Sequence, residues 1–126
     1  MLLLIFTVSI LIVNFDKLGE KSNLTLDDIE VSNVLFSNIN YVKDKGNDNY
    51  IIKMNVTNNN DKMVNLGDFY INIYNRKGEK IYTFDTGFIK DIKSGNKITL
   101  TSVTEENIGK ISSISIELPN LKYIEE

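Results

Sequence analysis

The chain has 126 residues, a formal net charge of −3, and neither cysteine nor histidine. This length fits one domain, since domains usually contain roughly 100–200 residues. Nucleic-acid binding rests on clustered lysine and arginine side chains that neutralise phosphates. The basic residues here are scattered among acids, so we expect no nucleic-acid partner. Without histidine and cysteine, the usual nucleophile–base pairs, soft-metal sites and disulfide bridges are excluded, so we expect neither an enzyme nor a cofactor.

The first 13 residues, MLLLIFTVSILIV, are apolar except for Thr7 and Ser9. As a helix they span about 20 Å, short of the roughly 30 Å hydrocarbon core of a bilayer. The length suits the apolar region of a signal peptide, although a basic flank and an A-x-A-like cleavage site are missing. Three interpretations stay open: an anchor or signal helix whose N-terminal part is missing, a cleaved signal with a weak site, or a buried helix or strand of the domain. We favour the first, with residues 1–15 as a membrane anchor or signal-like helix.

This interpretation places the protein in the cell membrane as a single-pass protein with its C-terminal domain outside the cytoplasm. Residues 16–28 are polar and indicate a loosely ordered spacer, although Leu24 and Leu26 can begin to pair with a sheet. From residue 29 to residue 122, apolar residues recur with the period of two that is typical of half-buried strands. We therefore expect one β-domain over 29–122.

Turn residues divide this domain into short strands. Gly78 in the segment Asn75–Gly78 suits a tight hairpin, because glycine accepts a positive φ. We expect strands or strand patterns, in chain order, at 29–42 (weak), 50–57, 64–74, 79–84, 98–102 and 111–118. Turns are expected at 44–47, 58–61 and 93–96, and a hairpin turn at 75–78. A single helical turn is expected at 104–109 and a frayed tail at 123–126.

About seven short strands at roughly ten-residue spacing predict an all-β fold, an immunoglobulin-like β-sandwich preceded by the short N-terminal apolar helix. A small barrel is the alternative architecture. No segment after residue 20 has convincing helical periodicity, which argues against an α/β fold.

Three segments carry a resemblance to a known family. VTNNNDKMV (56–64) precedes FYINIYNRKGEKI (69–81), and IKSGNKITL (92–100) follows. This order resembles the FxLYD-type bacterial immunoglobulin-like domains, in which Tyr-Asp and a hairpin glycine end an aromatic strand and a Pro-Gly turn comes before the next strand. Here Tyr74-Asn75, Gly78 and Ser94-Gly95 stand at those positions. The resemblance covers about half of the chain. It implies an immunoglobulin-like sandwich behind a membrane anchor or signal, with no catalytic residues to carry over.

Carboxylate and amide side chains are the remaining candidates for chemistry. Two carboxylates can act as general acid and base, but neighbours on a strand point to opposite faces, so adjacent pairs do not converge. Calcium takes oxygen ligands, and two loops are rich in Asn and Asp, although neither follows an EF-hand pattern and such residues also stabilise turns. The carboxylate pairs are Asp27-Asp28, Glu105-Glu106 and Glu125-Glu126, and the loops carry Asp44, Asn47 and Asp48 in one case and Asn58, Asn60 and Asp61 in the other.

Tyr70, Tyr74 and Tyr82 are the candidate partner patch, across the predicted hairpin. Tyrosine suits interfaces because it is large and rigid and has a polar tip, although cross-strand packing explains the same residues. We therefore expect a non-enzymatic, membrane-tethered, extracytoplasmic module that binds a protein or a cell-envelope component. The alternative is a structural subunit of an envelope or secretion assembly paired through strand edges. A carboxylate-based hydrolase is a further, weaker alternative.

Overall fold

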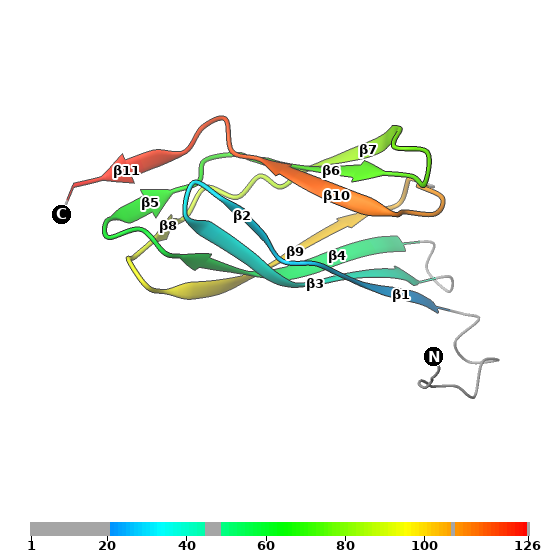
Figure 1. Ribbon diagram of the computed structural model, residues 1–126, viewed down its shortest axis with the longest axis horizontal. Coiled ribbons are helices and arrows are strands. Elements are labelled where there is room, and N and C mark those ends of the chain that lie inside the picture. Colours follow the sequence, from blue (N-terminus) through cyan, green and yellow to red (C-terminus); the bar gives the residue numbers. More distant parts are fainter. Residues whose placement is uncertain (1–20, 45–48, 107, 126) are drawn as a thin grey trace.

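The computed structural model describes residues 21–44, 49–106 and 108–125. In this part of the chain the protein is all-β without a helix, and its antiparallel strands form two layers (Figure 1). The apolar segment 1–13 and the predicted helix 1–15 lie outside the described residues. The predicted turn at 44–47 also lies largely outside them.

The first layer contains β1 (Lys21–Leu26), β3 (Val34–Asp44), β4 (Asn49–Asn58) and β9 (Lys97–Thr104), hydrogen-bonded in that order. A short strand, β2 (Ile29–Val31), also pairs with β3. It lies on the same edge of β3 as β1, since β4 occupies the other edge.

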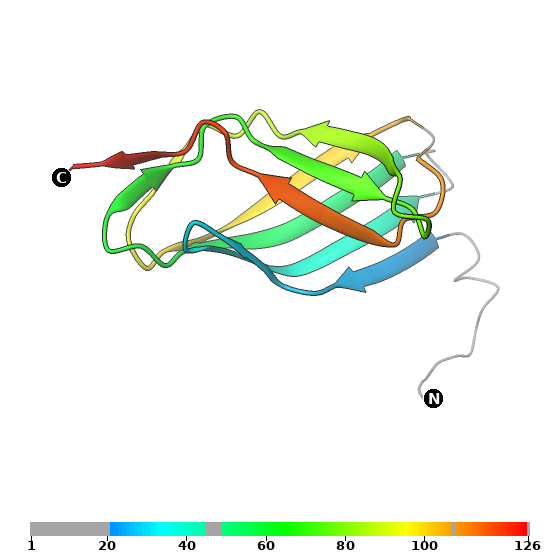
Figure 2. The ribbon, with the colours of Figure 1, turned by 45° about the horizontal axis from the view of Figure 1, so that its top comes forward.

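The second layer is the sheet β10–β6–β7, built from β10 (Ser113–Glu117), β6 (Tyr70–Tyr74) and β7 (Lys80–Asp85). A small sheet of β11 (Lys122–Ile124), β5 (Met63–Asn65) and β8 (Asp91–Ile92) lies at one end of the molecule (Figure 2). After β7 the chain returns to the first layer to pair β9 with β4, and then crosses again to pair β10 with β6.

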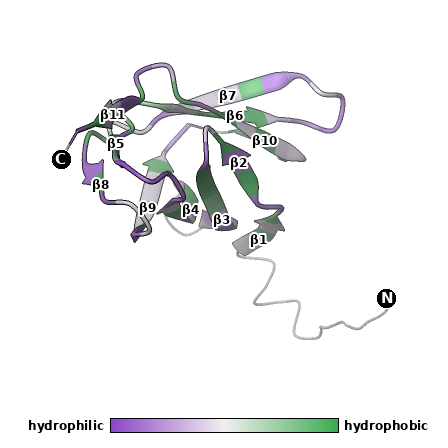
Figure 3. Cartoon of the chain, turned by 60° about the vertical axis from the view of Figure 1, so that its left-hand side comes forward, coloured by the Kyte–Doolittle hydropathy of each residue, from purple (hydrophilic) through white to green (hydrophobic). Residues whose placement is uncertain are grey.

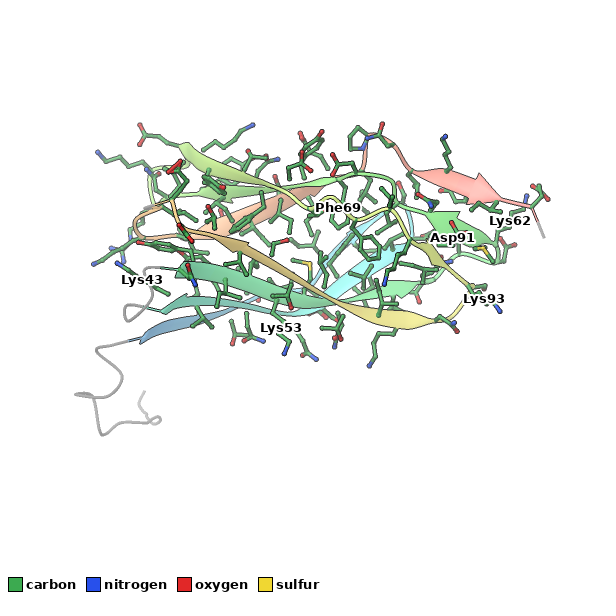
Figure 4. All side chains as sticks on the ribbon, turned by 180° about the vertical axis from the view of Figure 1, so that it is seen from behind. Lys43, Lys53, Lys62, Phe69, Asp91 and Lys93 are labelled. Atoms are coloured by element: carbon green, nitrogen blue, oxygen red, sulfur yellow. The ribbon has the colours of Figure 1, made fainter. Side chains whose placement is uncertain are left out.

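The core lies between the layers and follows the predicted alternation. Every second residue of β4 from Tyr50 to Asn58 is buried, and Ile71 and Ile73 of β6 are buried opposite. Phe69 packs against Phe36 of the first layer with 5.8 Å between ring centroids, and Figure 4 shows Phe69 between the layers. Burying one such side chain contributes roughly 1.5–3 kcal/mol. Hydrophobic residues concentrate on the strands and hydrophilic residues in many connecting turns (Figure 3).

The described residues form eleven strands, more than the predicted seven, because several are only two or three residues long. The weak strand region at 29–42 is in fact a hairpin. Ser32 and Asn33 both have positive φ values, 53° and 59°, which is the geometry of a two-residue turn that matches strand twist. A bulge between Ser37 and Asn40 then shifts the pairing of β3 with β4.

Three local predictions differ from the structure. The predicted spacer contains a full strand, β1, which pairs with residues 39–44 of β3. The predicted helical turn at 104–109 is absent from the described residues, because β9 continues to Thr104 and residues 105, 106, 108 and 109 have no helical state. The Thr104 hydroxyl oxygen still accepts the Glu106 N–H at 3.1 Å. Tyr123 and Ile124 of the predicted frayed tail belong to β11, which pairs with β5 and aligns Tyr123 with Val64.

Candidate functional site

The structure brings two of the three candidate tyrosines onto one face. Tyr70 and Tyr74 lie on the outer face of β6, because the alternating residues Ile71 and Ile73 point into the core. Tyr82 of β7 is paired with Ile73, and directly opposed residues share a face. Tyr82 therefore points inward.

The Tyr82 hydroxyl confirms this orientation. It donates a hydrogen bond of 2.9 Å to Thr104 Oγ1 in the first layer. Its ring also packs edge-on against Phe84, with 5.0 Å between centroids. The patch of three tyrosines is thus corrected to a pair, and Tyr82 instead connects the two layers.

A hydrogen-bonded row crosses the outer face between the two remaining tyrosines. The register places Ser115 of β10 and Thr83 of β7 on either side of Asn72. Asn72 Nδ2 donates to Ser115 Oγ at 3.2 Å, and Thr83 Oγ1 donates to Asn72 Oδ1 at 2.8 Å. Tyr74 Oη lies 3.0 Å from Ser115 Oγ and joins the same row. We call Tyr70, Asn72, Tyr74, Thr83 and Ser115 the β6 face.

Asn72 is only 1% exposed although it belongs to an outer face. Tyr70 and Tyr74 flank it along the strand, two residues away on each side. A buried amide is costly unless it is hydrogen-bonded, and the row satisfies this requirement. The β6 face is therefore a fixed arrangement of aromatic, hydroxyl and amide groups.

One end of the β6 face is acidic. The register places Asp85 and Glu117 on either side of Tyr70. Asp68 and Asp85 both accept the Gly87 N–H, at 2.9 and 3.2 Å. The side-chain hydrogen bond with Asp68 is the largest cause that raises the pKa of Asp85 above its usual value.

The second loop rich in Asn and Asp, residues 58–61, uses its amide side chains to hold a turn. Asn58 is fully buried, and its Nδ2 donates to the carbonyl oxygens of Lys62 and Ile92, both at 2.8 Å. Its Oδ1 accepts the Asn60 N–H at 2.9 Å and Asn60 Nδ2 at 3.0 Å. These contacts direct the Asn58 side chain into the turn, so Asn58 joins the β4–β5 turn to β8.

Other candidate acids do not converge. Asp27 and Asp28 are exposed between β1 and β2, beside the middle of β3, whereas Glu105 and Glu106 are exposed after β9, at one end of the first layer. Glu125 pairs instead with Lys62, with 2.6 Å between Nζ and Oε2. Across the described ranges, no group of three or more acids is placed to hold a metal ion. Asp44 ends β3, and Asn47 and Asp48 lie in the segment 45–48, outside the described residues.

Sequence reasoning missed the Asn72 row. Thr83 comes from the other strand of the same hairpin and Ser115 from a strand 43 positions later, and only the register brings both beside Asn72. The available signal was a polar residue between two tyrosines on a strand, which is equally typical of a solvated face.

The described ranges contain no helix long and apolar enough to cross a membrane. Comparison with known proteins found no matching family model, curated protein or solved structure.

Proposed function

We propose that this protein is a non-enzymatic, immunoglobulin-like module, tethered to the cell membrane by its apolar N-terminal segment, that binds a protein or cell-envelope component outside the cytoplasm. The immunoglobulin-like assignment is supported by the two crossings of the chain, which pair β9 with β4 and β10 with β6. Such crossings are typical of two-layer antiparallel sandwiches of this class. The segments that resemble the FxLYD-type domains coincide with the end of β4, the β6–β7 hairpin and the turn before β9.

The tether is supported by the sequence. Residues 1–13 form the longest apolar run in the chain, and residues 14–20 separate it from β1. Fully extended, this connection reaches at most about 24 Å. The domain would therefore stay close to the bilayer, with the start of β1 nearest to it.

The single observation that carries the binding proposal is the β6 face. Tyrosine loses little conformational entropy on binding and offers both an apolar ring and a polar tip. Asn72, Ser115 and Thr83 already satisfy one another, so the row holds the surface in one shape before a partner arrives. Tyr70 Oη has no hydrogen-bond partner in the part of the chain that the structure describes, which leaves it available to a partner.

Co-sedimentation of the full chain with purified cell envelopes tests the binding proposal. We expect the double variant Tyr70→Ser/Tyr74→Ser to bind at least about tenfold more weakly, which corresponds to about 1.4 kcal/mol. Tyr82→Phe is the matched control, since it removes an inward-facing tyrosine hydroxyl and leaves the β6 face intact. Equal binding by a folded Tyr70→Ser/Tyr74→Ser variant would refute the proposed site. Envelopes treated with protease or with glycan hydrolases then identify the class of partner.

Membrane fractionation with externally added protease tests the tether independently. We expect the full chain in the membrane fraction and its domain accessible to protease on intact cells. A freely soluble cytoplasmic pool would contradict the proposed location.

A further inference from the structure

The end of the molecule at which β1 begins also carries the β6–β7 hairpin. Figures 1 and 2 both show this hairpin and the start of β1 at the same end. The hairpin presents Arg76, the single arginine of the chain, together with Lys77 and, at the start of β7, Lys80. All three are exposed. We call these three residues the basic hairpin.

The turn is held in one shape by Asn75. Its Oδ1 accepts the N–H groups of Lys77 and Glu79, at 2.9 and 3.0 Å. Gly78 closes the turn with a φ of +81°. Because Asn75 organises the backbone from within, the side chains of Arg76 and Lys77 are left to project outward.

The nearest acid in sequence, Glu79, forms no ion pair with these cations, and its charge leaves residues 75–80 with a net charge of +2. The Glu79 carboxylate accepts a hydrogen bond of 2.8 Å from Asn75 Nδ2. Among the described residues, the ion pair found is Lys62–Glu125, which involves no member of the basic hairpin. Figure 4 shows Lys62 at the end of the molecule opposite to Lys43 and the start of β1. The basic hairpin therefore keeps its charge available to a partner.

Acidic residues lie at both ends of the molecule, and β3 ends in Asp44 at the end where β1 begins. Asp85 and Glu117 stand at the far ends of β7 and β10, away from the hairpin. Glu105 and Glu106 lie at the same end as the hairpin but follow β9 in the first layer. The basic hairpin therefore lies at the same end of the molecule as the start of β1, in the other layer (Figures 1 and 2).

We propose that the basic hairpin docks onto an anionic bilayer surface and so fixes the orientation of the tethered domain. This proposal rests on the membrane tether proposed above. Each basic residue close to an anionic membrane strengthens binding roughly fivefold. Such contacts are weak for a free protein, but a tether makes them intramolecular and raises their effective concentration. Docking would leave the acidic end of the β6 face, around Tyr70, pointing away from the membrane.

Energy transfer between the domain and the bilayer tests the proposal. The chain has no cysteine, so Ser112→Cys, whose N–H donates to the Tyr74 carbonyl oxygen beside the hairpin, provides a single labelling site for a donor dye. The full chain is reconstituted into phosphatidylcholine vesicles, or into vesicles mixed with phosphatidylglycerol, that carry an acceptor on a lipid headgroup. We expect more energy transfer in the anionic vesicles. The increase should vanish in about 0.5 M NaCl, where the Debye screening length is only a few ångströms.

Two charge-matched variants give the decisive comparison. Arg76→Ser/Lys77→Ser/Lys80→Ser should abolish the difference between the two kinds of vesicle. Lys90→Ser/Lys93→Ser/Lys97→Ser removes the same charge near the opposite end and should preserve it. In the other direction, Glu105→Gln/Glu106→Gln should increase energy transfer in anionic vesicles.

The outcomes separate this proposal from the tether. Flotation with pure phosphatidylcholine vesicles tests the tether alone, and failure to float counts against it. Equal energy transfer with neutral and anionic lipid overturns the docking proposal even where the chain floats. Equal loss in the two triple variants overturns it as well, since a general charge effect would then explain the result.

Discussion

The buried side chain of Asn58 offers the most quantitative test of the fold. It makes four hydrogen bonds, two to carbonyl oxygens and two from Asn60. Asn58→Ala removes all four. The carbonyl oxygen of Ile92 is then left buried without this donor, at a cost of about 1–2 kcal/mol, while water can partly replace the other three bonds at about 0.5 kcal/mol each. We therefore expect a loss of about 3 kcal/mol, a large fraction of the 5–15 kcal/mol typical of domains.

Urea unfolding followed by circular dichroism measures this loss as a lower midpoint with an unchanged slope. Asn55→Ala is the matched control on the same strand. Its side chain accepts one exposed hydrogen bond of 3.1 Å, from Thr99 Oγ1, so its removal should cost about 0.5 kcal/mol. Asn58→Asp should be at least as damaging as Asn58→Ala at neutral pH, because it turns a carboxylate toward two carbonyl oxygens. A loss for Asn58→Ala no larger than that for Asn55→Ala would refute this account.

For three further substitutions, the structure predicts whether the stability of the fold rises or falls. Tyr41 is 4% exposed, and its hydroxyl is buried with no partner within the described residues, so Tyr41→Phe should leave the free energy of unfolding unchanged or raise it by up to about 1 kcal/mol. The hydrogen bond with Asp68 raises the folded-state pKa of Asp85, so stability from this pair is present at acid pH and lost as pH rises through that pKa. Asp85→Asn should therefore raise Tm at pH 7, with the gain disappearing below the usual aspartate pKa of about 4. Gly67 has a φ of +65°, and an added Cβ would lie 2.6 Å from Asn120 Cβ, so Gly67→Ala should cost at least about 2 kcal/mol.

These three predictions have direct checks. Gly78→Ala is the control for Gly67→Ala, since its φ is +81° but an added Cβ meets open space, so it should cost about 1 kcal/mol. Equal losses for the two glycine variants would show that the contact with Asn120 does not matter. For Tyr41→Phe, a loss above about 1 kcal/mol would indicate that the hydroxyl has a stabilising partner. For Asp85→Asn, a lower Tm at pH 7 would show that the ionised Asp85 side chain stabilises the fold, which would contradict its raised pKa.

Local patterns were sufficient to predict several elements. The alternation from Tyr50 to Val56 predicts which residues of β4 face the core, because one face of the strand is buried and the other is not. Gly78 and Gly95 mark turns that require positive φ values, and the structure gives them +81° and +79°. Both signals depend on residues within a few positions of each other.

The remaining features depend on contacts between distant segments. Tyr123 belongs to a strand only because β5 is available to pair with it, 59 positions earlier in the register. Tyr82 faces inward because the hairpin pairs it with Ile73, and a shift of one residue would have turned it outward. The burial of Asn72 likewise follows from its long-range neighbour Ser115. The hydrophobic periodicity of a single sequence does not indicate which residues of two distant strands pair with each other.

Site-specific photo-cross-linking in cells tests the central claim, the β6 face as a binding surface, most directly. A photoreactive amino acid at position 70 should give a discrete adduct with one envelope component, because Tyr70 lies on the β6 face. The same group at position 101, on the exposed outer side of β9, should give no such adduct. Equal cross-linking at the two positions, or none at position 70, would contradict the account.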